Sequence, residues 1–384
     1  MTTLELQNVT KRYGKETVLH GLDLAVADGE TVAIFGPSGA GKTVLLRLIA
    51  GMAEPEEGEI LMDGEDLIDV APEDRSVGMA FQNFALFPHM SAFDNIAAPL
   101  DARRAKREAI ADGVHAIARL LKIDHVLGHA PRALSNGQKQ RTALARALVG
   151  APKILLLDDP LRNVDAKLRF EMRLELPRLL EGFGSTVLYV TQDYREAMAL
   201  GDRIAVLMDG RFIQVGTPEE IYLTPATVAV AELFGDPVIN LFDARVEPSG
   251  GGSVAVVGSA RLALSPGYAN LYGTTVTLGI RPENVAPAGA GTAGAIAARV
   301  AALLPLNDRL VRLLVTDEGA EFYTSRDFGG ETAGEGARVN VTAASQDVIL
   351  FDKASRRRIA PEGEAAVIPA APVGREHRAG RVSA

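Results

Sequence analysis

The residues with the clearest chemical potential lie in one stretch, TVAIFGPSGAGKTVLLRLIAG, which runs from Thr31 to Gly51. Its glycine-rich part has the spacing GxxxxGK[ST], in which backbone N–H groups converge on a phosphate. Lys42 adds a positive charge there, and Thr43 adds an oxygen for Mg²⁺. The stretch therefore predicts a site for a nucleoside triphosphate and its metal, formed by Gly36, Ser38, Gly39, Ala40, Gly41, Lys42 and Thr43. The alternative is a glycine-rich turn without a ligand.

A strand and a helix must hold this loop. The apolar run from Thr31 to Phe35 is typical of a buried strand, and the residues after Lys42 have the apolar spacing of a helix. The loop therefore connects a strand to the first turn of a helix, where bare backbone donors are available to an anion.

Polar residues also follow other predicted strands. Asp158 and Asp159 come after the apolar run 154–157, and Gln192 follows the run 186–191. Another apolar run, 203–208, ends at a turn. Because ligands of open α/β sheets bind at the carboxyl ends of the strands, these runs predict a largely parallel sheet with its site on one edge. One carboxylate there can hold Mg²⁺ and the second can orient a water molecule. Alone, two adjacent acids would more often cap a turn.

The segment 83–150 has helical spacing and many charges, so it predicts a helical insertion into the α/β core. Within it, Ser135 and Gln138 have the spacing of a capping box ahead of a long helix. Gly137 leaves backbone donors free for an anion, although a well-capped helix needs no ligand. Tyr13 stands in a predicted turn, where its ring could stack on a base or simply be exposed.

Composition limits the classes of function. The chain has 384 residues, enough for two or three domains, and no cysteine. Its net charge of −9 and pI near 5.3 argue against a general nucleic-acid binder. No apolar run reaches the length of about 20 residues that spans a bilayer. These properties favour a soluble or peripheral protein.

Taken together, the motifs resemble those of an ABC-transporter ATPase subunit. The resemblance is carried by GPSGAGKT at 36–43, Gln82, LSNGQ at 134–138, ILLLDDP at 154–160, LRNVD at 161–165 and VTQD at 190–193. It implies a head-to-tail dimer in which each ATP lies between the phosphate loop of one subunit and the LSNGQ segment of the other.

The resemblance also implies roles for single residues. Tyr13 would stack on adenine, Lys42 would contact the β- and γ-phosphates, and Asp165 would belong to the loop that joins the two sites. Thr43, Asp158 and Gln82 would bind the metal, and Gln82 would also connect the metal site to the permease. Ser135, Gly137 and Gln138 would complete the site across the dimer, and the catalytic set would be Asp159, Gln192 and Gln82.

Beyond residue 235 the chain becomes rich in glycine, valine and threonine, with short alternating runs that predict a small antiparallel β-barrel or a pair of barrels. GIRPENV at 279–285 resembles the regulatory domain of maltose-type sugar importers. We therefore expect an α/β P-loop ATPase domain at 1–235 with a helical subdomain at about 83–150. An all-β, OB-like domain is expected at 236–358 and a disordered tail at 359–384.

Three residues depart from the family pattern. Asp159 stands where the family has Glu, Gln192 where it has the switch His, and Asn136 where it usually has Gly. Asp159 is one methylene shorter, so its carboxylate should lie about 1.5 Å back, and a misplacement of about 1 Å can cost roughly a hundredfold in rate. Gln192 cannot carry the charge of a proton. Asn136 is a milder change, because Asn tolerates a left-handed backbone better than other residues do. The departures at Asp159 and Gln192 favour a weakened hydrolytic site and a heterodimer with a second ATPase, and the alternative is a homodimer that tolerates them.

The main hypothesis is the ATPase subunit of a binding-protein-dependent importer for a carbohydrate, polyol, glycerol or related solute. Its expected cofactors are ATP and Mg²⁺. Its expected partners are two transmembrane permease subunits and, indirectly, an extracytoplasmic solute-binding protein, with no nucleic acid. Its expected place is the cytoplasmic face of the inner membrane, where the apolar segment 84–90 would receive the permease, unless that segment is ordinary core. The alternatives are a non-hydrolytic regulatory subunit and a soluble ABC ATPase unrelated to transport.

Overall fold

The computed structural model describes residues 3–250, 252–289, 291–292, 294–306, 309–326 and 333–364. They form two compact units, one up to Pro218 and one from Glu219 onward, and each is described by itself. The predicted boundary at 235/236 remains a prediction. Most of the predicted tail, 359–384, lies outside the described residues.

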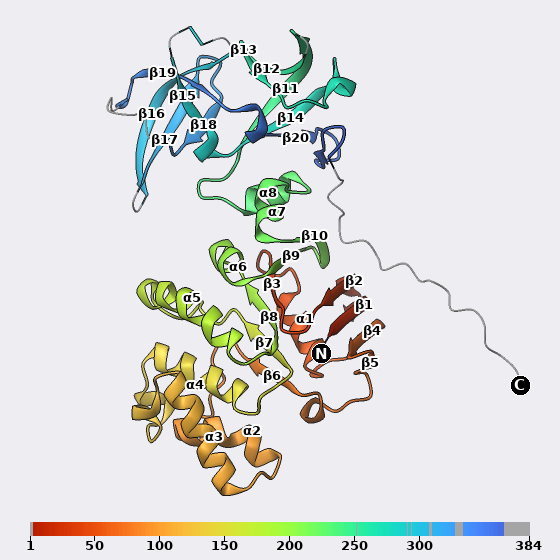
Figure 1. Ribbon diagram of the computed structural model, residues 1–384, viewed down its shortest axis with the longest axis vertical. Coiled ribbons are helices and arrows are strands. Elements are labelled where there is room, and N and C mark those ends of the chain that lie inside the picture. Colours follow the sequence, from red (N-terminus) through yellow and green to blue (C-terminus); the bar gives the residue numbers. More distant parts are fainter. Residues whose placement is uncertain are drawn as a thin grey trace, which may run out of the picture. The chain divides into compact units, whose positions relative to one another are not determined.

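The first unit contains two sheets (Figure 1). One is antiparallel, with strand order β2-β1-β4-β5, and comprises β1 (Leu4–Tyr13), β2 (Glu16–Val26), β4 (Glu57–Met62) and β5 (Glu65–Asp66). The other has the order β10-β9-β3-β8-β7-β6 and comprises β3 (Thr31–Phe35), β6 (Val77–Ala80), β7 (Ile154–Asp158), β8 (Thr186–Thr191), β9 (Arg203–Met208) and β10 (Arg211–Gly216). It is parallel except for β10, which pairs antiparallel with β9. The predicted largely parallel sheet is thus present.

Strand β7 is buried on both faces because its side chains alternate between two cores. Ile154 and Leu156 pack with α1 (Lys42–Ile49) and with apolar residues of the antiparallel sheet. Leu155 and Leu157 pack on the opposite side, against the helices that follow. The continuous apolar run in the sequence is therefore explained by a strand in the middle of the unit.

The helical insertion contains α2 (Ala92–Ala102), α3 (Arg107–Leu120) and α4 (Asn136–Leu148), which gather at one end of this unit (Figure 1). Its apolar positions Ile110, Val114 and Ile117 face a shared core, as their spacing predicts. The predicted capping box is present, since Ser135 N donates to Gln138 Oε1 at 2.9 Å and Gln138 N donates to Ser135 Oγ at 3.3 Å. Two further helices, α5 (Ala166–Glu181) and α6 (Tyr194–Leu200), follow β7 and β8.

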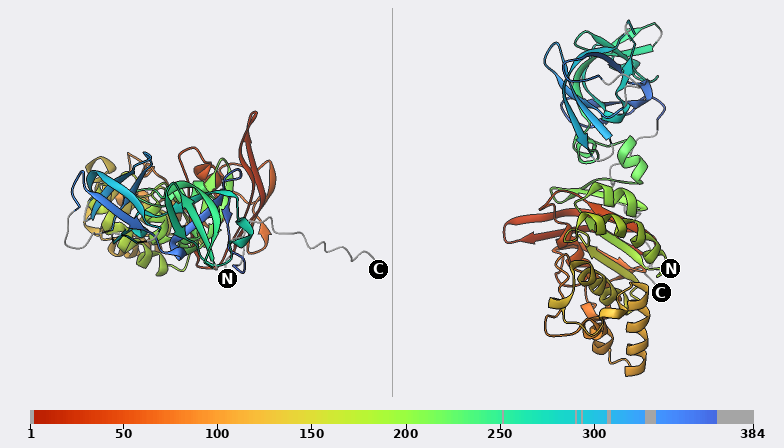
Figure 2. Two further views of the ribbon diagram at one scale, coloured as in Figure 1. Left: turned by 90° about the horizontal axis from the view of Figure 1, so that it is seen from above. Right: turned by 90° about the vertical axis from the view of Figure 1, so that its left-hand side faces the viewer.

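The second unit begins with α7 (Pro218–Leu223) and α8 (Val228–Leu233) and continues as antiparallel strands. One sheet has the order β13-β12-β11-β14-β20-β21 and the other β15-β19-β16-β17-β18. Figure 2 shows the strands curving around one interior, where Leu278, Phe322 and Leu350 are buried together. The strands are β11 (Asn240–Ser249), β12 (Gly252–Val257), β13 (Ala260–Ala263), β14 (Thr275–Ile280), β15 (Ala286–Ala288), β16 (Ile296–Leu306), β17 (Arg309–Thr316), β18 (Glu321–Thr324), β19 (Arg338–Thr342), β20 (Val348–Asp352) and β21 (Arg358–Ile359).

Candidate functional site

The phosphate loop connects β3 to α1, and its glycines are needed by the backbone. Gly39 and Gly41 have φ angles of 84° and 101°, in the left-handed region that L side chains rarely adopt. A Cβ on Gly36 would lie 2.0 Å from the carbonyl oxygen of Leu207 in β9, so only glycine fits there. Ala40 is buried beneath the loop. The sequence thus allows the loop to curl tightly over the end of the sheet.

Lys42 is buried at the start of α1 and lies along the loop. Its Nζ donates to the carbonyl oxygens of Gly36 and Pro37 at 2.8 and 2.7 Å. Burial lowers the pKa of Lys42, and the charges of Asp158 and Asp159 act in the opposite direction. The ammonium group is therefore held by groups of the protein at the mouth of the loop, close to where a phosphate would enter.

The carboxyl end of β7 brings two acids to the same place. Thr43 Oγ1 donates to Asp158 Oδ1 at 3.1 Å, so a hydroxyl and a carboxylate oxygen stand side by side. Burial raises the pKa of both Asp158 and Asp159. Asp159 also has a φ of 46°. This backbone conformation is uncommon for a residue other than glycine, and residues that adopt it are often found at functional sites. Oxygen donors of this type suit Mg²⁺.

These groups surround a cavity of about 250 Å³. It brings together most of the residues predicted within this subunit, and it also includes residues that the sequence interpretation did not assign. Its lining is Val18, Ser38, Gly39, Gly41, Lys42, Thr43, Val44, Gln82, Asp158, Asp159, Arg162, Val190 and Gln192. Arg162 was missed, although its sequence signal is visible: a basic residue three positions after Asp159, in the loop that follows the buried strand.

The other predicted residues lie away from this cavity. Tyr13 ends β1 and is 49% exposed, with Lys11 Nζ 5.2 Å from its ring centroid. Ser135, Gly137 and Gln138 form the first turn of α4. Asp165 caps α5, and its Oδ1 accepts a hydrogen bond from Leu168 N at 2.9 Å. One chain alone does not bring these two helix starts into its own phosphate pocket.

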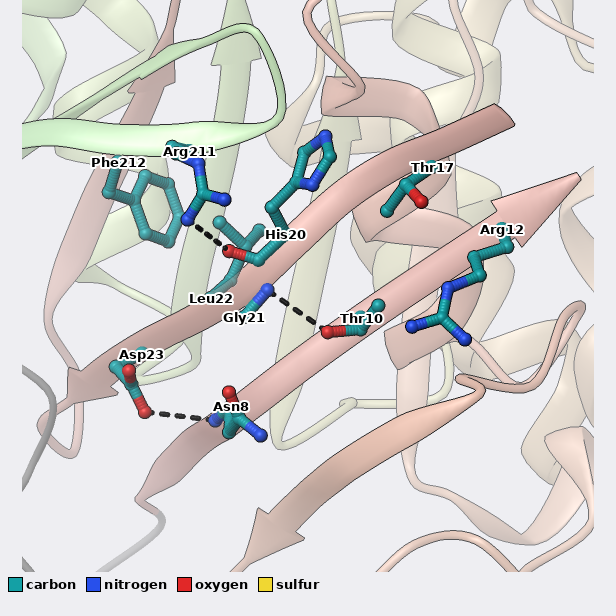
Figure 3. A pocket seen from close by; sticks show the side chains of 10 residues that line it. All are labelled: Asn8, Thr10, Arg12, Thr17, His20, Gly21, Leu22, Asp23, Arg211 and Phe212. Carbon is teal, nitrogen blue, oxygen red and sulfur yellow. Dashed lines mark hydrogen bonds between the residues drawn. The ribbon is translucent and has the colours of Figure 1, made fainter. Parts of the chain in front are cut away.

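A larger cavity of about 520 Å³ lies on the outer side of β1 and β2, next to β10 (Figure 3). Its polar groups are largely engaged with neighbouring protein groups. Arg211 Nη1 donates to His20 O at 3.3 Å, and Asn8 N donates to Asp23 Oδ1 at 2.9 Å. Arg12 pairs with Glu57 at 2.6 Å. Chemistry therefore favours the smaller cavity as the functional site, because it joins the phosphate loop to the acids after β7 and the larger cavity does not.

Strand order, phosphate loop and paired acids define this molecule as a P-loop nucleotide-binding protein with an attached β-rich unit. Residues 19–162 match the family model described as ABC transporter, and residues 235–285 match the MalK OB fold domain. Together these findings confirm the predicted fold class. Among the described residues no helix is long and apolar enough to cross a membrane.

Relatives extend this assignment over most of the chain. The sn-glycerol-3-phosphate import ATP-binding protein UgpC of Chromobacterium violaceum is 41% identical over 363 residues, covering 94% of this chain and 96% of that protein. UgpC of Escherichia coli K12 is 45% identical over 287 residues, covering 74% and 80%. The dimeric ATP-binding cassette MJ0796, solved with ADP and Pi, is 33% identical with a TM-score of 0.51 over 56% of this chain and 98% of that one. This chain belongs to the ABC transporter ATP-binding proteins of the MalK and UgpC type, and it is an ABC ATPase coupled to transport.

Proposed function

We propose that this chain binds Mg²⁺–ATP and powers the import of sn-glycerol-3-phosphate or a related polyol or carbohydrate through a membrane complex. The solute class rests on the UgpC proteins, whose names state that import, and on the match to the Chromobacterium violaceum protein over 94% of this chain. The complex would include two permease subunits and an extracytoplasmic binding protein. The chain would lie on the cytoplasmic face of the membrane as a peripheral subunit.

The observation that carries the proposal is the contact between Thr43 and Asp158 beside the buried Lys42. Thr43, Asp158 and Gln82 would hold Mg²⁺, which when bound offsets the negative charge of the phosphates. Lys42 would exchange its two carbonyl acceptors for phosphate oxygens. Asp159 and Gln192 would face the terminal phosphate and the attacking water.

The site within one chain would be completed by a second ATPase subunit. Ser135, Gly137 and Gln138 stand at a capped helix start away from the cavity, which is consistent with a role toward the nucleotide of a partner. Tyr13 is exposed at the end of its hairpin, where it could stack on adenine. Asp165 would contact the partner from the start of α5. The dimeric cassette MJ0796 supports a dimer of this general type.

We further propose that hydrolysis at this subunit's own site is weakened and that the natural dimer pairs it with an ATPase that has Glu and His at the corresponding positions. The support is the pair of departures at Asp159 and Gln192, both of which line the phosphate cavity. The same residues favour the second candidate, a nucleotide-binding regulatory subunit that does not hydrolyse ATP. A single-turnover measurement separates the two, because only the first releases phosphate from this site.

The test is nucleotide binding and solute uptake by the complex purified with its permeases and placed in vesicles. Lys42→Ala should abolish uptake and lower ATP affinity by at least roughly tenfold. Lys106→Ala, which removes an exposed lysine at the start of α3, should change neither. Uptake of radiolabelled sn-glycerol-3-phosphate is then compared with uptake of maltose and glycerol. ATP affinity that survives Lys42→Ala would contradict the site, and a complex that takes up none of the three solutes would contradict the solute class.

A further inference from the structure

Arg162 stands on the rim of the phosphate cavity, in the loop between β7 and α5. Its side chain is 48% exposed, whereas the side chain of Asp159 three residues earlier is only 8% exposed. Arg162 also lines an adjoining cavity of about 400 Å³, which shares Asp159 and Gln192 with the first. The guanidinium therefore stands where the phosphate cavity opens toward its neighbour.

The contacts of Arg162 connect two groups that are expected to act on ATP. Its Nη1 lies 3.5 Å from Asp159 Oδ2. The side-chain oxygen of Gln82, in the amide orientation that satisfies both its ends, accepts from Arg162 Nε at 3.3 Å and from Nη1 at 3.2 Å. The fork of one guanidinium thus spans a carboxylate and an amide.

The neighbouring residue strengthens the same connection. Asn163 Nδ2 donates to the backbone oxygen of Gln82 at 2.7 Å. Two consecutive side chains of the loop after β7 therefore bind Gln82, one at its amide and one at its backbone. Because Gln82 follows β6 and Asp159 follows β7, these contacts hold the ends of two neighbouring strands in one arrangement.

The charges around Asp159 also indicate that Arg162 is needed to balance its buried carboxylate. Asp158 and Asp159 are adjacent and buried, and Lys42 and Arg162 are the cations that act on Asp159. Without Arg162, Asp159 would keep Lys42 alone of these two cations, and an unpaired buried charge is costly. Among the side-chain contacts of the described residues, the one to Arg162 is what orients the carboxylate of Asp159.

We propose that Arg162 is a positioning residue that holds the Asp159 carboxylate and the Gln82 amide in register at the phosphate cavity. The arginine acts through these two groups and does not itself activate water. It compensates in part for the short side chain of Asp159, because an anchored carboxylate keeps one direction where a free one would rotate. This inference rests on the proposed function, since it concerns hydrolysis at the same site.

The test uses the purified full-length chain with its permease complex. Single-turnover hydrolysis of γ-labelled ATP is measured there, because this method detects hydrolysis even at a slow site. Arg162→Ala should lower the single-turnover rate by roughly tenfold and change the KM for ATP by less than about threefold. Arg162→Lys should recover part of the rate, because an ammonium can pair with Asp159 but cannot span both groups. Arg119→Ala, which removes an exposed arginine of α3, is the matched control for charge.

A double-mutant cycle separates positioning from general stability. In an Asp159→Asn background the further change Arg162→Ala should have a smaller effect than in the wild type, because one of the two contacts of Arg162 is already weakened. Binding of a fluorescent ATP analogue in EDTA gives a readout that does not depend on hydrolysis, and Arg162→Ala should leave it within about twofold. If Arg162→Ala fails to fold, the cycle is measured with Arg162→Lys.

An unchanged or faster rate in Arg162→Ala, or effects that add fully with those of Asp159→Asn, would overturn the inference. These outcomes differ from failure of the proposed function. If the proposed function itself fails, Lys42→Ala leaves ATP affinity unchanged, and the wild-type chain releases no phosphate under any condition.

Discussion

At the scale of single residues, the chemistry depends on side chains that the ends of β3, β7 and β8 bring to one cavity. Lys42 and the pair Thr43 and Asp158 provide the groups that a metal-bound triphosphate requires. Asp159 and Gln192 line the same cavity. An aspartate is one methylene shorter than a glutamate, and a glutamine cannot carry the charge of a proton as a histidine can. Under the proposal of a weakened site, we expect changes at these two residues to alter hydrolysis more than nucleotide binding.

The first prediction follows from their chemistry. Asp159→Glu together with Gln192→His should raise the hydrolysis rate of the isolated chain by at least roughly tenfold, because the carboxylate gains about 1.5 Å of reach. ATP affinity should stay within about threefold, since the phosphate loop is unchanged. Steady-state phosphate release and analogue binding measure the two effects. Full activity of the unmodified homodimer would contradict the idea of a weakened site.

A second prediction concerns the buried Glu196 at the start of α6. Its Oε2 accepts hydrogen bonds from Tyr189 Oη at 2.9 Å and from Thr191 Oγ1 at 2.8 Å. Burial raises the pKa of Glu196 above its usual 4.5, so the folded protein holds this proton more tightly than the unfolded chain. Its contribution to stability is therefore complete below the unfolded pKa and is lost as the pH rises through the folded pKa.

Glu196→Gln keeps an acceptor oxygen but cannot titrate. The free energy of unfolding of the wild type relative to this variant should fall as the pH rises from about 4.5 toward neutrality. Urea denaturation at several pH values measures it, with the exposed Glu108→Gln on α3 as control. A difference independent of pH, or one that rises with pH, would show that Glu196 is not buried in this way.

At the scale of elements, α4 connects two segments of the first unit for which we propose contacts with partner subunits. Its first turn carries the LSNGQ segment, and its last turn carries Arg146. Arg146 Nη1 and Nη2 donate to the carbonyl oxygens of Ala85 and Phe84 at 2.7 and 3.0 Å, and its guanidinium lies 5.6 Å from the centroid of the Phe87 ring. Phe84 and Ala85 have positive φ angles of 64° and 46°.

This arrangement gives the third prediction. Because Arg146 holds two strained residues of the apolar segment 84–90, Arg146→Ala should release that segment. The free energy of unfolding should fall by about 1 to 2 kcal/mol, and uptake driven by ATP should fall more than ATP binding does. Urea denaturation and vesicle uptake measure the two effects, with Lys139→Ala on the same helix as control. Uptake equal to the wild type would contradict this role for Arg146.

At the scale of the whole molecule, each unit has its own hydrophobic core. In the second unit α7 and α8 are tied to the strands that follow them. Val228 and Phe351 are fully buried in one cluster, and the buried Arg281 donates from Nε to the carbonyl oxygen of Tyr222 at 3.1 Å. Its guanidinium also lies over the Tyr222 ring, 3.5 Å from the centroid. The residues between 219 and 235 thus pack against the strands of this unit.

The fourth prediction compares two fragments. A fragment of residues 219–364 should unfold cooperatively, whereas one of 236–364 should be less stable by at least about 2 kcal/mol. The shorter fragment leaves Arg281 buried without its acceptor in α7, and it exposes apolar side chains such as Phe351. Thermal and urea denaturation of both measure the difference. Equal stabilities would support the boundary at 235/236 that the sequence predicts.

The sequence by itself determined the phosphate loop, the buried strands and the capped start of α4, because these depend on local spacing: GxxxxGK[ST], apolar runs and Ser135 with Gln138. It also placed Asp158, Asp159 and Gln192 at the ends of strands that meet at one edge of the sheet. Only the tertiary structure decided the contacts of Arg162 and Arg146. Arg162 reaches Gln82 from 80 residues away, and Arg146 reaches Phe84 from 62 residues away. Such contacts depend on which strand ends and loops the fold brings together, and no local pattern encodes that.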